Sequence, residues 1–442
     1  MNNIQECIEA TKTALSETSF RFFDEFSYGI DYRKNNYFLL DETGSLFLKQ
    51  IICDGKLDIQ QISKSYNVHE SIIEKDSIAF MQQLQQQSHY GHELNLGNEQ
   101  EEQFLKFFTE KKIPITAIIE ITEGCNEDCV HCYRPVPKKE VWTPELFEKI
   151  CIQLRELGTL QLDFTGGEPF LKKNFPTYLD IADKHGFIIS ILTNGTLIQD
   201  DSIDFLSKIK TRMIYFSLYS NDAGIHDSIT KLPGSFDKTI STINKLISKG
   251  VPASINSPIM EHNKDSVKGI KRLADDLRID VKFAYKISKS YNPKRQFKGI
   301  NVFSDEEFKK HIHDKEVSLY SEMINARKQG EIIQRNRIRT CDTGFRSITI
   351  SPEGDVIPCT ALRLKCGNVL ENNLDYLWQS NPNLKLWREE GSLVKKQCKT
   401  CESYDYCEPC PAGYFTEHNS LDGIDEVTCG FGKTFSSCVS CD

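Results

Sequence analysis

The sequence predicts an α/β fold in which a curved, partial (β/α)6 barrel lies between a small N-terminal αβ unit and a cysteine-rich C-terminal region. Three observations lead to this prediction. Apolar, β-branched runs alternate with amphipathic helical segments from about residue 113 to residue 290. A separate hairpin-and-helix pattern precedes them. Ten of the 16 cysteines lie between Cys341 and Cys441.

Turn and helix signals between residues 20 and 88 predict the N-terminal unit. Residues 30–40 have the pattern of a hairpin that turns at Lys34-Asn35-Asn36. Three helical segments are expected after it, at Ser45–Cys53, Asp58–Tyr66 and Glu70–Gln87. The polar stretch from Ser88 to Gln100 is predicted to be a linker.

Six apolar, β-branched segments predict the strands of the barrel. They are Ile115–Thr122, Leu160–Thr165, Phe187–Thr193, Met213–Tyr219, Ala253–Ile259 and Val281–Ile287. Helical segments separate them, such as Pro144–Leu157 with Thr143 as its N-cap. Six βα repeats imply a parallel sheet with right-handed crossovers. Because ligands of such folds bind at the C-terminal ends of the strands, functional motifs are expected there.

Composition and charge exclude several classes of protein. The net charge of −9 argues against a nucleic-acid-binding protein, which needs a basic stripe. No apolar stretch approaches the roughly 20 residues of a membrane span. The first 15 residues include Glu6 and Glu9 and lack the apolar core of a secretory signal. A cytoplasmic protein is therefore expected, and there clustered cysteines indicate metal ligation or redox work.

A trio of cysteines directly follows the first predicted strand: Cys125, Cys129 and Cys132. Three thiolates at this spacing can bind three irons of a cubane cluster and leave the fourth iron open. A zinc knuckle completed by His131 is the alternative, but no second pair of ligands follows nearby. The spacing resembles the CxxxCxxC signature of radical S-adenosylmethionine (SAM) enzymes, with His131 where that family commonly has an aromatic residue.

Motifs after the later strands resemble the same family in the same order. Gly166-Gly167-Glu168-Pro169 resembles its GGEP motif, in which paired glycines allow close approach to a ligand and Glu168 would pair with the cofactor's ammonium. Polar residues after strands three to five would complete the SAM site: Thr193, Asn194, Ser217 and Asn256. In the loop 225–236 the family often has an arginine, where this chain has Ser228, Thr230 and Lys231.

The resemblance implies a fold and a reaction type for residues 114–290. The fold is a partial, TIM-like radical SAM barrel. SAM and a [4Fe–4S] cluster would supply a radical that abstracts a hydrogen atom from the substrate, while the protein positions and shields it. A low-potential electron donor, flavodoxin or ferredoxin, is implied as a partner. No catalytic acid or base is assigned, although Glu120, Asp163 and Tyr285 are candidates for the barrel interior.

The C-terminal region resembles the SPASM domain, which binds two auxiliary [4Fe–4S] clusters and would bring the total to three. Carried over by position, the resemblance assigns one cluster to Cys398, Cys401, Cys407 and Cys429, and the other to Cys341, Cys359 and Cys410. Only two residues separate Cys407 from Cys410, where the family has three. The fourth ligand of the second cluster is left open between Cys366, one of Cys438 and Cys441, and a substrate thiolate.

Without metal, this region is expected to hold together poorly, because its apolar residues show little periodicity. A zinc ribbon built on the pairs Cys398/Cys401 and Cys407/Cys410 is the alternative to clusters.

The N-terminal unit resembles the PqqD-like RiPP recognition element, a winged-helix-like domain that binds leader peptides of ribosomally made, modified peptides. The resemblance rests on residues 37–44 and the three helices after them. It implies that a leader peptide adds a strand near Tyr37–Leu40 and packs on the third helix, at Ile73, Ile78 and Met81. An ordinary winged-helix domain is the alternative.

Together the regions resemble peptide maturases that form sulfur-to-carbon thioether crosslinks in sactipeptides and ranthipeptides, with a precursor peptide bound through its leader. The alternatives are carbon–carbon crosslinking or another side-chain oxidation, and a zinc-stabilised peptide-binding scaffold without chemistry. The expected domains are the recognition element (1–95), a linker (96–113), the radical SAM core (114–290), a helical connector (291–340) and the SPASM domain (341–442).

Overall fold

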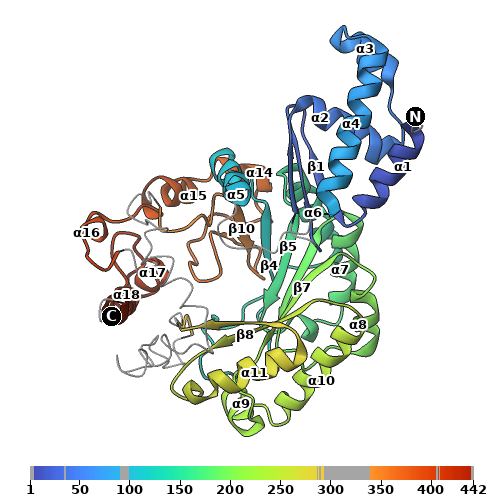
Figure 1. Ribbon diagram of the computed structural model, residues 1–442. Coiled ribbons are helices and arrows are strands. Elements are labelled where there is room, and N and C mark those ends of the chain that lie inside the picture. Colours follow the sequence, from blue (N-terminus) through green and yellow to red (C-terminus); the bar gives the residue numbers. More distant parts are fainter. Residues whose placement is uncertain are drawn as a thin grey trace.

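The computed structural model describes residues 4–33, 36–89, 99–285, 287, 290–292, 339–404, 407 and 409–439. An N-terminal αβ unit, a central sheet flanked by helices and a C-terminal region follow one another along the chain (Figure 1). Most of the predicted connector, 293–338, lies outside the described residues.

The N-terminal unit is a three-stranded antiparallel sheet with helices. Its strands have the order β1 (Thr18–Phe22), β2 (Ser27–Asp31) and β3 (Asn36–Leu40), so β1 and β3 are edge strands. Its helices are α1 (Ile4–Ala14), α2 (Glu42–Lys49), a π-helical turn (Gln50–Asp54), α3 (Ile59–Tyr66) and α4 (Glu70–His89). The predicted hairpin strands and three helices are confirmed, although its turn at Lys34-Asn35 lies outside the described residues and α1 and β1 were not expected.

The predicted linker contains a helix, α5 (Glu99–Lys111). Its Phe108 is fully buried and packs edge-on against Tyr28 of β2, with ring centroids 4.6 Å apart. The prediction of a linker over 96–113 is therefore wrong for these residues, because α5 completes a small apolar core on the face of the N-terminal sheet.

Eight strands form the central sheet, in the order β11-β10-β4-β5-β6-β7-β8-β9. Six of them are parallel and follow the chain in order, close to the predicted bounds: β4 (Thr116–Thr122), β5 (Gln161–Gly166), β6 (Ile188–Thr193), β7 (Thr211–Ser217), β8 (Ala253–Pro258) and β9 (Asp280–Ala284). The crossover helices are α6 (Pro144–Glu156), α7 (Phe175–Lys184), α8 (Asp200–Leu206), α9 (Ala223–Thr230), α10 (Ser235–Ser248) and α11 (Val267–Leu277). The expected partial (β/α)6 barrel is confirmed.

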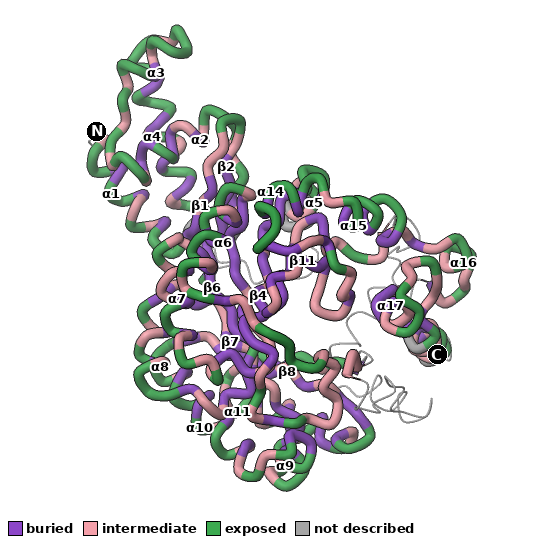
Figure 2. Tube along the Cα trace, turned by 180° about the vertical axis from the view of Figure 1, so that it is seen from behind, coloured by how far each residue is buried: buried purple, intermediate pink, exposed green. Residues whose placement is uncertain are grey.

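The core lies between these strands and helices, where Figure 2 shows the strands as the most continuously buried part of the chain. Ile119, Phe164, Ile191 and Phe216, on four adjacent strands, are fully buried. Strands covered by crossover helices are expected to be this apolar. The helices begin where their caps allow, and the predicted cap Thr143 accepts a hydrogen bond from the backbone N–H of Leu146 at 3.2 Å.

The C-terminal region extends the barrel sheet. Strand β10 (Ser347–Ile350) pairs in parallel with β4, and β11 (Val356–Ile357) pairs antiparallel with β10. Ile350, Trp378 and Trp387 belong to the same buried cluster as the barrel strands. The first half of this region therefore shares an apolar core with the barrel, and its need for metal stays a prediction. Its short helices α14 (Leu374–Gln379) and α15 (Pro382–Leu386) contribute to this cluster and also contact each other. They have 6 and 5 residues, which is too few for the sequence to show a clear helical period.

The N-terminal unit docks on the loops that precede β5 and β6. The Nε of Arg21 donates to the carbonyl of Thr159 at 2.7 Å, and its guanidinium lies over the ring of Phe187, 5.0 Å from the centroid. The hydroxyl of Tyr28 donates to the carbonyl of Gly158. The unit therefore sits at the N-terminal ends of the barrel strands, opposite the end at which the motifs lie.

Candidate functional site

The first cysteine group lies in the loop after β4, at the C-terminal end of the strands. Several polar contacts involve its sulfurs. The backbone N–H of Glu127 donates to Sγ of Cys125 at 3.4 Å, and Sγ of Cys129 donates to Oε2 of Glu127 at 3.1 Å. Nδ2 of Asn194 lies 3.9 Å from Sγ of Cys125. The N–H donors to Cys125 are of the kind that tune sulfur ligands of iron, whereas the thiol proton of Cys129 would be lost on binding iron.

Two backbone N–H groups of the GGEP motif hold the cysteine loop against β5. The N–H of Gly167 donates to the carbonyl of Thr122, and the N–H of Glu168 donates to the carbonyl of Gly124, both at 2.8 Å. A Cβ on Gly167 would lie 1.9 Å from the carbonyl oxygen of Gly124. Glycine is therefore required here by the approach of two segments of this chain, a reason the sequence did not reveal.

Glu168 is fully buried beneath this loop. Its carboxylate accepts hydrogen bonds from the N–H of Phe170 at 3.0 Å, the N–H of Asn194 at 2.8 Å and the hydroxyl of Thr193 at 2.8 Å. Burial raises the pKa of Glu168 to about 7, although these three donors oppose the shift. The structure thus gives Glu168 a role in joining β5 to β6, and its pairing with the SAM ammonium stays a prediction.

The other predicted SAM residues lie along the same end of the sheet. The side-chain amide of Asn194 donates to Oδ1 of Asn126 at 3.0 Å, so the end of β6 contacts the cysteine loop directly. Ser217 on β7 and Asn256 on β8 are partners in register and are partly exposed. Pro169 is buried and begins a short 3-10 turn. The predicted set therefore gathers at the carboxyl ends of β5 to β8.

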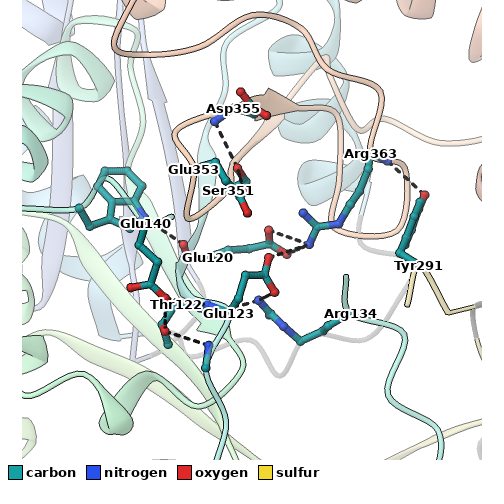
Figure 3. A network of polar contacts seen from close by, with 12 residues as sticks. Glu120, Thr122, Glu123, Arg134, Glu140, Tyr291, Ser351, Glu353, Asp355 and Arg363 are labelled. Carbon is teal, nitrogen blue, oxygen red and sulfur yellow. Dashed lines mark hydrogen bonds and ion pairs between the residues drawn. The ribbon is translucent and has the colours of Figure 1, made fainter. Parts of the chain in front are cut away.

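Sequence reasoning missed a buried charge network beside the cysteine loop (Figure 3). Nη2 of Arg363 lies 2.9 Å from both carboxylate oxygens of Glu120, and Arg134 forms an ion pair with Glu123. Glu120 was expected only as one candidate for the barrel interior. No local pattern points to Arg363, because it is 243 residues away from Glu120 in the chain.

Electrostatic interactions connect the C-terminal cysteines in two groups, each containing three members of one predicted ligand set. Cys359 interacts electrostatically with Cys410 and Cys341, and Cys398 interacts with Cys429 and Cys401. A cavity of about 250 Å³ is lined by five of the predicted ligands, four from one predicted set and Cys410 from the other: Cys398, Cys401, Cys407, Cys410 and Cys429.

Cys366 takes a different position. Its side chain is fully buried in the main apolar core, and its thiol donates to the carbonyl of Leu364 at 3.4 Å. Burial raises its pKa to about 12, as expected of a core thiol. This placement argues against Cys366 as the fourth ligand of the second cluster. The side chain of Cys438 and the whole of Cys441 lie outside the described residues.

The donor set of this cavity fits an iron–sulfur cluster, because thiolates are the usual ligands of cluster iron and five cysteines line the cavity. Within the described part of the chain, no three Cys, His, Asp or Glu side chains are grouped closely enough to hold one metal ion.

Two family models match the chain where these sites lie. The radical SAM superfamily model matches residues 119–274, and the SPASM model, an iron–sulfur cluster-binding domain, matches residues 341–411. None of the described helices is long and apolar enough to cross a membrane.

Individual proteins are similar at lower identity. The antilisterial bacteriocin subtilosin biosynthesis protein AlbA of Bacillus subtilis is 28% identical over 312 residues, which are 67% of each chain. An AdoMet-dependent heme synthase of Methanosarcina barkeri is 24% identical over 66% of this chain and 90% of its own. The crystal structure of Streptococcus suis SuiB bound to the precursor peptide SuiA has a TM-score of 0.65 at 18% identity, covering 93% of this chain and 98% of SuiB.

The expected identity of the central and C-terminal regions therefore stands: the chain contains a radical SAM domain and a C-terminal SPASM domain, and its cofactors are SAM and [4Fe–4S] clusters.

Proposed function

We propose that this protein modifies a ribosomally made precursor peptide by forming a thioether crosslink between a cysteine sulfur and a carbon of another residue. Two relatives support a peptide substrate. AlbA is named for the biosynthesis of the bacteriocin subtilosin, and SuiB has been crystallised with its precursor peptide SuiA.

The observation that carries the proposal is the combination of an N-terminal unit with a barrel that has two cysteine sites. One site is the trio after β4, and the other is formed by the C-terminal cysteines. The structural similarity to SuiB covers 93% of this chain. The uncovered 7% is smaller than the N-terminal unit, so most of that unit must belong to the similar part. An enzyme for a small substrate such as a porphyrin needs no separate docking unit, so the unit favours a peptide over the substrate of the heme synthase relatives. We propose that residues 1–95 are a PqqD-like recognition element for the leader.

The proposed leader site differs from the one expected. Ile73 and Met81 are 6% and 0% exposed, so they belong to the core of the unit and cannot line a groove. Strand β3 is an edge strand, and its Leu39 is 45% exposed. An extended leader that adds to this edge would gain backbone hydrogen bonds there and an apolar contact at Leu39.

The sites have the following proposed roles. When bound, SAM and its cluster supply the one-electron chemistry that removes a hydrogen atom from the peptide. The first trio of cysteines would hold that cluster, and the ends of β5 to β8 would hold SAM. Cys398, Cys401, Cys407 and Cys429 would hold one auxiliary cluster, and Cys341, Cys359 and Cys410 the other. We propose that a flavodoxin or ferredoxin supplies the electrons. We also propose the domain bounds 114–290 for the barrel and 341–442 for the SPASM domain.

The test uses anaerobically purified protein with SAM, a reductant and a cysteine-containing precursor peptide encoded beside its gene. We expect a mass loss of about 2 Da per crosslink, since two hydrogens leave, and a cysteine that no longer reacts with iodoacetamide. The same mass loss with a reactive cysteine would support carbon–carbon crosslinking. If SAM is not cleaved with any peptide, the result would support the alternative of a zinc-stabilised peptide-binding scaffold without chemistry.

A second test addresses recognition. Leu39→Glu should weaken binding of the leader by about tenfold, because a charge replaces an apolar contact at the β3 edge. Ile72→Glu is the matched control, since Ile72 is 50% exposed on α4 and not on the edge strand. Equal affinities for both variants and the parent would place the leader elsewhere.

A further inference from the structure

Two loops that contain predicted iron ligands lie next to each other near the end of β4. One holds the first cysteine group, and the other holds Cys359 of the second group, which is Cys341, Cys359 and Cys410. The radical loop, residues 123–134, contains Cys125, Cys129 and Cys132, and the auxiliary loop, residues 359–366, begins with Cys359. The two loops are joined by charged and polar contacts between side chains that are almost completely buried.

The radical loop is closed on itself by an ion pair. Arg134, two residues after Cys132, binds the carboxylate of Glu123, two residues before Cys125, and Nη2 of Arg134 also donates to the carbonyl of Thr122 at 3.0 Å. The side chain of Glu123 is 0% exposed and that of Arg134 is 11% exposed. The two ends of the loop are therefore held together next to the end of β4.

Arg363 joins the auxiliary loop to this closed loop. It lies four residues after Cys359, and its Nη2 donates to both oxygens of Glu120 at 2.9 Å. The same nitrogen lies 3.6 Å from Oε1 of Glu123. Glu123 is therefore shared between the two arginines, and Figure 3 shows both guanidinium groups pointing toward it from different segments of the chain.

Tyr291 makes a second connection between the loops. Its backbone N–H donates to the carbonyl of Tyr133, next to Cys132, at 2.9 Å. Its hydroxyl donates to the carbonyl of Ala361 at 2.8 Å and accepts from the N–H of Arg363 at 3.3 Å. Tyr291 therefore contacts both loops close to a cysteine: at Tyr133, one residue after Cys132, and at Ala361, two residues after Cys359.

Stability alone does not explain buried ion pairs of this kind. Desolvation of the two charges cancels much of their attraction, so an apolar pair of similar size can stabilise a fold equally well. Two contacts from one guanidinium nitrogen to both oxygens of a carboxylate do, however, restrict orientation, because the planar guanidinium presents its donors in fixed directions. The contacts occur where two groups of iron ligands must keep a defined separation.

We propose that Arg363, with Glu120, Glu123 and Tyr291, is a positioning residue that sets the auxiliary loop in a fixed place relative to the radical loop. The bracket formed by these four residues would hold the second cysteine group at a constant distance from the first, and with it any substrate between them. The inference requires clusters at both loops but not the thioether chemistry proposed above.

The test compares Arg363→Met, Arg363→Lys and a matched control in anaerobically purified holoprotein. Lys365→Met is the control, because Lys365 lies in the same loop and pairs with Asp355 at 2.7 Å, but its side chain is 57% exposed. Amide hydrogen exchange is measured over 359–366, and the magnetic interaction between the reduced clusters is measured by electron paramagnetic resonance.

For Arg363→Met we expect about tenfold faster exchange over 359–366 and an altered interaction between the clusters, with iron content unchanged. Arg363→Lys should restore part of each signal, and Lys365→Met should match the parent. The proposal would be overturned if Arg363→Met is less stable but has the exchange rates and spectra of the parent. The pair of Arg363 and Glu120 would then stabilise the fold without positioning the auxiliary loop.

Tyr291→Phe gives an independent answer if Arg363→Met does not fold. It removes one hydroxyl, and with it the bonds to Ala361 and Arg363, while both ion pairs remain. Faster exchange over 359–366 in this variant supports the bracket. Exchange equal to that of the parent contradicts it.

Discussion

The backbone N–H of Asn194 donates to the carboxylate of Glu168 at 2.8 Å, which ties the end of β6 to the GGEP loop. The side chain of Asn194 continues this connection to Asn126 in the radical loop, at 3.0 Å. The buried carboxylate of Glu168 is thus connected through Asn194 to the radical loop, which contains the first three cysteines. Glu168 acts here through its neighbours, whatever it also contributes to the cofactor.

Replacing Glu168 should disturb the first cysteine group more than the others. Glu168→Ala leaves two buried donors, on Thr193 and Asn194, without this acceptor, at a cost of about 1–3 kcal/mol each. We expect this variant to lose about four irons per chain, the content of one cluster, while Glu168→Gln loses fewer. Iron analysis checks this, with the exposed Glu145→Gln as control, and full iron content in Glu168→Ala would contradict it.

Gly167→Ala should have a similar local effect for a steric reason. Its new Cβ would lie 1.9 Å from the carbonyl oxygen of Gly124, so the GGEP loop and the radical loop must separate. We expect the spectroscopic signal of the SAM-binding cluster to be lost while the auxiliary signals remain. Gly224→Ala is the control, because its Cβ meets only Oδ1 of Asp222 at 3.2 Å. Equal spectra for both variants would refute the steric argument.

Arg21 should matter for the docking of the N-terminal unit. Arg21→Met removes the donor to the carbonyl of Thr159 and leaves that buried oxygen unpaired, which should lower the free energy of unfolding by about 2 kcal/mol. Urea unfolding measures this. Arg33→Met is the control, since Arg33 and Glu17 form an exposed ion pair of 3.9 Å that should contribute little. Equal losses in both variants would contradict a specific role of Arg21.

His226 should make the protein less stable in mild acid. Burial lowers its pKa from 6.5 to about 4, while Asp227 opposes the shift, and its Nδ1 accepts from the N–H of Tyr219 at 3.2 Å. Between these pKa values the unfolded chain binds a proton that the folded chain does not bind. Stability is therefore lost as the pH falls below 6.5.

The size of this effect follows from the two pKa values. From about pH 7.5 to about pH 5.5 the parent should lose about 1 kcal/mol more than His226→Gln, measured by urea unfolding. An identical pH dependence of the parent and the variant would show that folding does not lower the pKa of His226, which contradicts the prediction.

The barrel could be predicted from the sequence because parallel strands covered by helices are apolar along most of their length, as Phe187–Thr193 illustrates. The motifs could be placed because they directly follow such strands. Strand β10 was missed because four residues carry too short a pattern, and α5 was missed because its charged residues resemble a linker.

The polar network could not be predicted for a different reason. The pairing of Glu120 with Arg363 joins residues far apart in the chain, and no local period records it. The same holds for Glu168, whose motif indicates a ligand contact, while its partners Thr193 and Asn194 are known only once β5 and β6 are side by side. For Cys366, the sequence offered a possible metal ligand, and only packing reveals a core residue.

The most direct test of the account is the content of iron and acid-labile sulfide per chain after anaerobic purification, compared with that of the Cys125→Ala/Cys129→Ala/Cys132→Ala variant. The account predicts about twelve irons in the parent and about eight in the variant, which corresponds to three cubanes with one held by these cysteines. Zinc with little iron, and no difference between the two proteins, would contradict it.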